Sequence, residues 1–338
     1  MLNPMTPLQR ALAPALVALA ACGPADGRTP AAAPAAPLPA GFWDTWGDGL
    51  AELNGYRLRT PRYGHARDGY AVQVFVTETF TDKTRVKSDG GHDDEFPVLK
   101  LNDIRRFQTG IYDYGLMTSV FTPLDGRLAA AVPTKIAFSS QEWCGVMFDE
   151  ILVDPGTFRR STRSYFDGEA DTDEKRPLPA GTLFADTLPI AVRGITGPAL
   201  GAGAVQEVTV LPTLATVRLA HTDFASAEGT VGRDETIRSR TVPAGTFDVR
   251  ATTFALRNGP STTWEVEVAP PHRIIAWSTS DGETAELMGS TRRAYWKDNG
   301  PGGEQFLAEL GLAPLAPPPA RSPPAAAPAS APPPAGAP

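Results

Sequence analysis

Residues 69–79 read GYAVQVFVTET, and this stretch decides the fold class. β-branched and aromatic side chains dominate it and partly alternate with polar ones, which is the pattern of a half-buried β-strand. A second stretch of the same kind, residues 51–60 (AELNGYRLRT), precedes it. The residues between the two, 61–68 (PRYGHARD), combine Pro, Gly and Asp, which are typical of turns. The sequence therefore predicts a β-hairpin early in the folded region.

The same strand and turn signals recur along the rest of the chain. Their spacing of roughly 8–12 residues is typical of an all-β architecture. Two helices are also predicted, over residues 183–192 (LFADTLPIAV), where Pro189 would kink or end the helix, and over residues 304–310 (EQFLAEL). The further predicted strands are residues 96–102, 109–121, 135–140, 145–153, 158–166, 205–211, 214–221, 235–241, 246–256, 262–268, 273–279 and 283–288.

So many strands have to protect their edges, because an exposed strand edge pairs with other chains. An antiparallel sheet buries one face and wets the other, and curling or closure covers its edges. We therefore expect a mainly β fold, with a strongly curved antiparallel sheet or open (half) barrel and one or two helices. The segment 183–192 should pack in the concavity of this sheet or across its mouth.

Composition divides the chain into four parts. Residues 1–21 have the short apolar run of a lipoprotein signal peptide, and residues 22–41 form a Pro/Ala-rich tether. Residues 42–312 form a β-rich domain, which a break near residues 175–205 would divide into two sub-domains. Residues 313–338 are again rich in Pro and Ala, and we expect them to be disordered.

The end of the apolar run carries a cysteine. Its surroundings, Leu19-Ala20-Ala21-Cys22, resemble the lipobox of bacterial lipoproteins. The resemblance implies that Cys22 is acylated and becomes the first residue of the mature protein, anchored in the cell envelope with its domain facing the periplasm or the cell exterior. The resemblance also implies the outer membrane rather than the inner one, because Gly23 follows the cysteine where an Asp tends to hold lipoproteins on the inner membrane. An ordinary cleaved signal with an incidental cysteine is the alternative.

The charge of the chain bears on its partners. The formal net charge is −7, and a mildly acidic surface argues against nucleic acid, which needs a basic face. The common nucleotide, zinc-protease and serine-hydrolase motifs are missing, so the sequence gives no ground for predicting a cofactor.

The second half of the domain carries a further resemblance. Residues 242–249 (VPAGTFDV) are followed by a predicted strand with Trp264, the turn 270–273 (PPHR) and the strand start 274–277 (IIAW). This order resembles a family of uncharacterised bacterial periplasmic β-proteins, similar in shape to lipoprotein-carrier folds. The resemblance covers about residues 140–296 and implies a half barrel with an apolar cavity and no established activity. The first hundred residues of the mature chain depart from the family pattern.

Cys144 is the one cysteine left after lipidation, within SSQEWCG at residues 139–145. A cysteine nucleophile needs a lowered pKa and a neighbouring base, and spacing selects none of the four histidines. A buried thiol beside Trp143 is the favoured interpretation. The histidines are His65, His92, His221 and His272.

Two acidic stretches are weak candidates for metal ions. Residues 167–174 (DGEADTDE) concentrate carboxylates, but Thr172 stands where a calcium loop needs its sixth-position Gly. Residues 89–95 (DGGHDDE) have a single His. We therefore predict solvated loops and no metal. The carboxylates that would bind calcium are Asp167, Glu169, Asp171 and Asp173.

Three functions remain open from the sequence. The first is a lipid-anchored module that binds an apolar ligand, such as a lipid or acyl chain, in its concave face. The second is a structural or protein-interaction lipoprotein of the envelope with no ligand. The third and least favoured is a hydrolase that uses Cys144 or the acidic loop.

Overall fold

A computed structural model describes residues 37–169 and 171–315. The predicted signal peptide, Cys22 and most of both Pro/Ala-rich segments lie outside these residues. No helix in the described ranges is long and apolar enough to span a membrane.

Sixteen strands and a few short helical segments make up the described fold. The strands of the first half are β1 (Ala51–Arg62), β2 (His65–Thr81), β3 (Glu95–Thr109), β4 (Tyr112–Pro123), β5 (Lys135–Glu142), β6 (Gly145–Asp154), β7 (Thr157–Ser164) and β8 (Thr172–Pro177). Those of the second half are β9 (Thr182–Phe184), β10 (Val205–Leu211), β11 (Ala227–Arg233), β12 (Arg238–Val242), β13 (Gly245–Leu256), β14 (Ser261–Glu267), β15 (Ile274–Thr279) and β16 (Thr284–Arg293). The helical segments are α1 (Phe42–Trp46), η1 (Ala185–Thr187), α2 (Leu188–Ala191), α3 (Leu214–Ala220), η2 (Tyr295–Lys297) and η3 (Gly303–Leu310).

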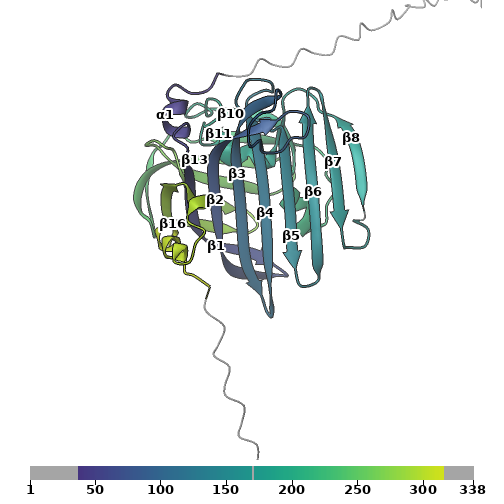
Figure 1. Ribbon diagram of the computed structural model, residues 1–338. Coiled ribbons are helices and arrows are strands. Elements are labelled where there is room, and N and C mark those ends of the chain that lie inside the picture. The colour runs from purple at the N-terminus through teal and green to yellow at the C-terminus, as the bar shows by residue number, and fades with distance from the viewer. Residues whose placement is uncertain (1–36, 170, 316–338) are drawn as a thin grey trace, which may run out of the picture. The chain divides into compact units, whose positions relative to one another are not determined.

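All strands belong to one sheet, with the order β8-β7-β6-β5-β4-β3-β2-β1-β16-β15-β14-β13-β11-β10-β9 and with β12 paired to β13. Figure 1 shows strands of the first half side by side. Every pairing is antiparallel except β9 with β10. The mainly β, antiparallel fold predicted from the sequence is therefore confirmed. The sheet is not closed, because β8 and β9 are two free ends.

Buried residues alternate with more exposed ones along the strands, which is the pattern of a sheet with one face packed on the core. In β6, Met147, Asp149, Ile151 and Val153 are buried at every second position, so one face of the strand supplies the core. One apolar cluster lies mainly on β2 to β7, and a second lies on β1, β2 and the strands of the second half. Segment 183–192 contributes Ile190 to the first cluster and Leu188 to the second, so it packs against both halves of the sheet.

The helix predicted over 183–192 is only partly right. The segment begins as β9, continues through the 3₁₀ turn η1 and is α-helical only from Leu188 to Ala191. Pro189 stands in the first turn of α2 and does not end it, because the N–H that proline lacks has no partner in a first turn.

Three other local predictions are wrong. The strand predicted over 214–221 is the helix α3, because the Thr213 hydroxyl caps its start by accepting from Thr216 N. The acidic segment predicted as a loop forms β8 from Thr172, because Thr172 to Pro177 pair with β7. The hairpin loop predicted over 61–68 shrinks to Tyr63 and Gly64, both at positive φ, because the residues around them pair between β1 and β2.

Candidate functional site

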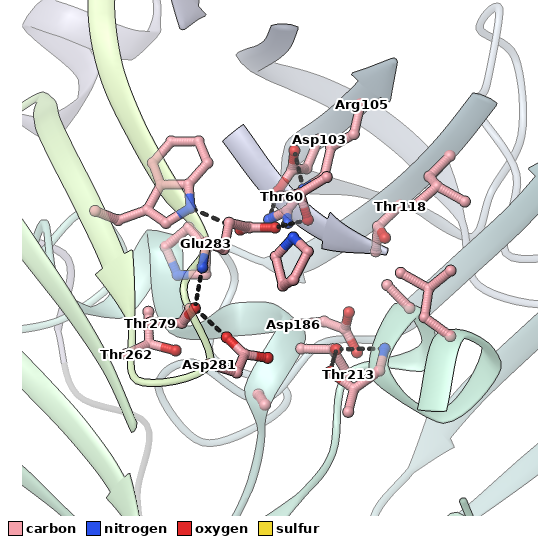
Figure 2. Close-up of a pocket in the computed structure, with 18 of the residues that line it drawn as sticks. Thr60, Asp103, Arg105, Thr118, Asp186, Thr213, Thr262, Thr279, Asp281 and Glu283 are labelled. Carbon is pink, nitrogen blue, oxygen red and sulfur yellow. Dashed lines mark hydrogen bonds and ion pairs between the residues drawn. The ribbon is translucent and has the colours of Figure 1, made fainter. Parts of the chain in front are cut away.

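A pocket of about 400 Å³ lies between the two halves of the sheet. Its walls come from β1 to β4 and the β1–β2 turn on one side, from β14, β15 and the β15–β16 turn on the other, and from η1, α2 and α3. Such a volume is in the range of small-molecule sites. Figure 2 shows the polar side chains that line it.

One wall carries an arginine held by two carboxylates. Asp103 and Arg105 stand two residues apart on β3 and so share a face of the strand. Arg105 Nη2 lies 3.0 Å from Asp103 Oδ2, and its Nη1 lies 2.8 Å from Glu283 Oε1, just before β16. Glu283 also accepts from Trp277 Nε1 at 2.9 Å and from the Thr60 hydroxyl at 2.8 Å. Three strands, β1, β3 and β15, and the β15–β16 turn therefore fix this carboxylate–arginine–carboxylate group (Figure 2).

The arginine keeps its charge in this setting. Burial disfavours the Arg105 guanidinium, but the negative charges and hydrogen bonds of Asp103 and Glu283 outweigh that cost and raise its pKa. One guanidinium cation lies between the two carboxylates of Asp103 and Glu283. The pocket wall therefore has more negative than positive charge at this point, and more hydrogen-bond acceptors than Arg105 alone can satisfy.

Asp186 is a further carboxyl in the pocket wall. It lies in η1, only 7% of it is exposed, and its Oδ2 accepts from the backbone N–H of Leu214 at 3.2 Å. No side chain in residues 37–169 and 171–315 forms a salt bridge with it. Burial is the main cause that raises its pKa to about 7. The Leu214 N–H and Arg105 oppose this rise, while the charges of Asp103 and Asp149 add to it. Figure 2 shows Asp186 beside Thr213, apart from Glu283.

Apolar side chains complete the lining. Leu101, Leu116 and Val120 come from β3 and β4, and Trp264 and Trp277 come from β14 and β15. The pocket therefore combines an apolar wall with buried or partly buried carboxylates. Such a site suits a molecule with an apolar part and a polar end.

The tip of the β1–β2 hairpin borders the pocket opening. Tyr63 and Gly64 line the pocket and are exposed, and the Tyr63 hydroxyl lies 2.6 Å from that of Tyr114. Arg62 donates to Tyr114 Oη at 3.1 Å and to the carbonyl of Leu219 in α3 at 2.7 Å. Burial raises the pKa of Tyr63, but its hydrogen bonds and the Arg62 charge outweigh this effect and lower it. The hairpin tip is thereby tied to α3.

The structure does not bring the sequence-based catalytic candidates together. Cys144 is exposed in the β5–β6 turn, so the expectation of a buried thiol is wrong, because Trp143 at the same tip points out of the core and is 70% exposed. No histidine in the described ranges forms a hydrogen bond with Cys144. His65 and His92 are exposed, His221 lies 2.7 Å from Glu169, and His272 faces the Glu267 carbonyl.

The acidic candidates are also dispersed. Glu169 contacts His221 at 2.7 Å and Arg218 at 3.4 Å, while Asp173 pairs with Arg163 at 2.8 Å. Asp167 and Asp171 are exposed. In the part of the chain that the structure describes, no group of three or more His, Cys, Asp or Glu side chains is placed to hold a metal ion.

Sequence reasoning did not identify Asp186, although one signal was available. It is the only ionisable residue in the otherwise largely apolar segment 183–192. A carboxyl that a folding chain buries in an apolar segment commonly has a perturbed pKa and marks a functional site.

Comparison with protein-family models and with curated proteins finds no match to this chain.

Proposed function

We propose that this protein is a membrane-anchored envelope lipoprotein whose β domain binds a small amphipathic ligand, with an apolar chain and a cationic head group. The observation that carries the proposal is Asp186, a buried carboxyl in the pocket wall without a salt-bridge partner among the described residues. Leu101, Leu116, Val120 and the two tryptophans would cover the apolar chain. This refines the purely apolar ligand expected from the sequence.

The charges of the pocket favour a cation over an anion. Asp103, Glu283 and Asp281 face or border the pocket together with Asp186. Arg105 is already shared by two of these carboxylates, and Arg62 is bound to Tyr114 and to the Leu219 carbonyl. An anionic head group would meet these carboxylates, while the two arginines of the described lining, Arg62 and Arg105, are already engaged, which is costly at a desolvated site. An ammonium group would supply the missing partner of Asp186.

The remaining parts of the proposal rest on the sequence. Acylation of Cys22 would anchor the chain, with the outer membrane favoured over the inner one. The open half barrel also stays part of the proposal. It is supported by the pocket lining, which comes from strands on both sides of β1.

Ligands that share a chain and differ in head group test the proposal. With the full chain carrying Cys22→Ser, we expect isothermal titration at pH 8 to give decylamine a lower Kd than decanol or decanoate. Asp186→Asn should weaken decylamine binding roughly tenfold to a hundredfold, because it removes a buried charge-assisted contact. It should leave decanol binding unchanged.

The pH dependence gives a second readout of the same experiment. Because the pKa of Asp186 is about 7, the carboxylate that attracts the amine is present above pH 7 and is lost below it. A primary amine stays protonated to about pH 10. Decylamine should therefore bind more tightly as pH rises from 6 to 8, and this trend should vanish in Asp186→Asn. Asp281→Asn at the exposed opening is the matched control and should preserve the trend. Equal affinities for the three head groups would contradict the proposal.

A further inference from the structure

One end of the first half of the sheet carries exposed apolar side chains. In an antiparallel meander every second turn lies at the same end, which here groups the β1–β2, β3–β4, β5–β6 and β7–β8 connections. Each presents one large apolar side chain: Tyr63 (54% exposed), Ile111 (78%), Trp143 (70%) and Tyr165 (71%). We call these four residues the apolar rim. Figure 1 shows that the β3–β4 and β5–β6 tips lie at the end away from α1.

The opposite end of the same strands differs. Its connections, residues 82–94, 124–134 and 155–156, present a single exposed large apolar side chain, Val86. Nearby α1 adds Trp43. Scattered exposed apolar residues are normal on proteins, but one on each of four successive tips at one end is a pattern.

We propose that the apolar rim docks this domain on the surface of a lipid bilayer. Strands in a sheet lie about 4.8 Å apart, so tips two strands apart form a row with a spacing of roughly 10 Å. Such a row of separate projections makes no groove for a shaped partner and fits a flat, deformable surface. Trp and Tyr are the side chains that favour the membrane–water interface, because each has an apolar body and a polar atom.

Three of the four connections are tight two-residue turns, which place their side chains at the very end of the hairpins. Tyr63 and Gly64 form a two-residue turn at positive φ, and the β3–β4 and β5–β6 hairpins also turn through two residues, Gly110-Ile111 and Trp143-Cys144. Ile111 and Trp143 on these two-residue turns have little neighbouring structure to fold back onto, whereas the Tyr63 hydroxyl is held by that of Tyr114. Apolar insertion, rather than charge attraction, would drive docking, because the chain has a net charge of −7.

The rim also borders the pocket. Tyr63 belongs to both, and Gly64 and Asp281, which line the pocket, are exposed at the same end of the sheet. Docking would therefore bring the opening against the bilayer surface from which an amphipathic ligand enters. Docking itself does not depend on the proposed ligand.

Vesicle partitioning tests the rim. The full chain with Cys22→Ser, which lacks the acyl anchor, should co-sediment with phosphatidylcholine vesicles at both low and high salt. The double variant Ile111→Ser, Trp143→Ser should lower the partition coefficient about tenfold or more, because two inserted side chains are lost. The matched control Trp43→Ser, Val86→Ser removes exposed apolar residues near the other end and should bind like its parent.

A probe at the rim gives an independent readout. In the Cys22→Ser chain Cys144 is the single thiol, and it lies exposed beside Trp143. A polarity-sensitive dye on Cys144 should shift to the blue when vesicles are added. The emission of the same dye on Val86→Cys, in a Cys22→Ser chain that also carries Cys144→Ser, should not shift.

Three outcomes would overturn the proposal: equal losses for the rim and control variants, no blue shift at Cys144, or a rim-dependent dimer by light scattering without vesicle binding. Asp186→Asn should bind vesicles like its parent, so failure of the ligand proposal is distinguishable from failure of the rim.

Discussion

Arg193→Met should lower the free energy of unfolding by about 3–5 kcal/mol, because it leaves the buried carboxylate of Glu52 without a charged partner. Arg193 and Glu52 are almost fully buried, with Arg193 Nη1 2.8 Å from Glu52 Oε1. The guanidinium also donates to the carbonyls of His272 and Pro271 and lies 4.3 Å from the centre of the Phe75 ring. It thereby joins the chain after α2 to β1 and to the β14–β15 turn.

Two further variants separate charge from packing. Arg57→Met makes the same chemical change at an exposed ion pair of β1 with Glu286, and it should cost less than about 1 kcal/mol. The double variant Arg193→Met, Glu52→Gln should be more stable than Arg193→Met alone, because the uncompensated charge is gone while an oxygen acceptor for Asn54 remains. Urea titrations of the four chains measure these differences. A double variant as unstable as Arg193→Met alone would argue against the buried charge as the cause.

Asp186→Asn should make the protein more stable at pH 8, by about 4 kcal/mol. The reason is the sign of the shift: the pKa of Asp186 rises from 3.8 to about 7 on folding. Protonated Asp186 therefore favours the folded state. The stability that it contributes is fully present below about pH 4 and is lost as pH rises through about 7. Asparagine is neutral at every pH and can still accept the Leu214 N–H, so it avoids the loss.

Urea titrations at pH 5, 6, 7 and 8 would measure this effect. The difference between Asp186→Asn and its parent should be largest at pH 8 and shrink towards pH 5. Asp281→Asn, at the exposed opening of the pocket, should follow the parent at all four pH values. A pH-independent difference would show that packing, rather than ionisation of Asp186, separates the two chains.

The local pattern of apolar and turn residues was sufficient to predict most strands of the sheet. The predicted strand 205–211 coincides with β10, and the predicted strand 246–256 lies one residue inside β13. The failures arose where a neighbour decided the outcome. The segment 214–221 contains the β-branched Thr216 and Val217, but the Thr213 cap starts a helix that runs from Leu214 to Ala220. Residues 172–177 are mostly exposed and mostly charged, and they are a strand only because β7 offers an edge.

The pocket was beyond the reach of sequence reasoning because its parts come from distant strands. Arg105 and Glu283 are 178 residues apart in the chain and meet only through the pairing of β1 with β16. Cys144 attracted attention because it is a rare residue, yet it lies exposed at a hairpin tip. Asp186 carried a readable signal, since a carboxyl within a largely apolar segment has to be explained.

The place of β1 in the sheet governs how the chain reaches its native state. Among the strands that the structure describes, β1 is the first to be made, and one of its two neighbours, β16, is the last. The meander from β1 to β8 forms from contacts local in sequence, whereas closing the β1–β16 pair must overcome the loop entropy of nearly the whole domain. Until Thr284 and the residues after it emerge, β1 remains an open edge with free backbone groups. The unfinished domain is therefore prone to pairing with other chains at that edge until β16 is made.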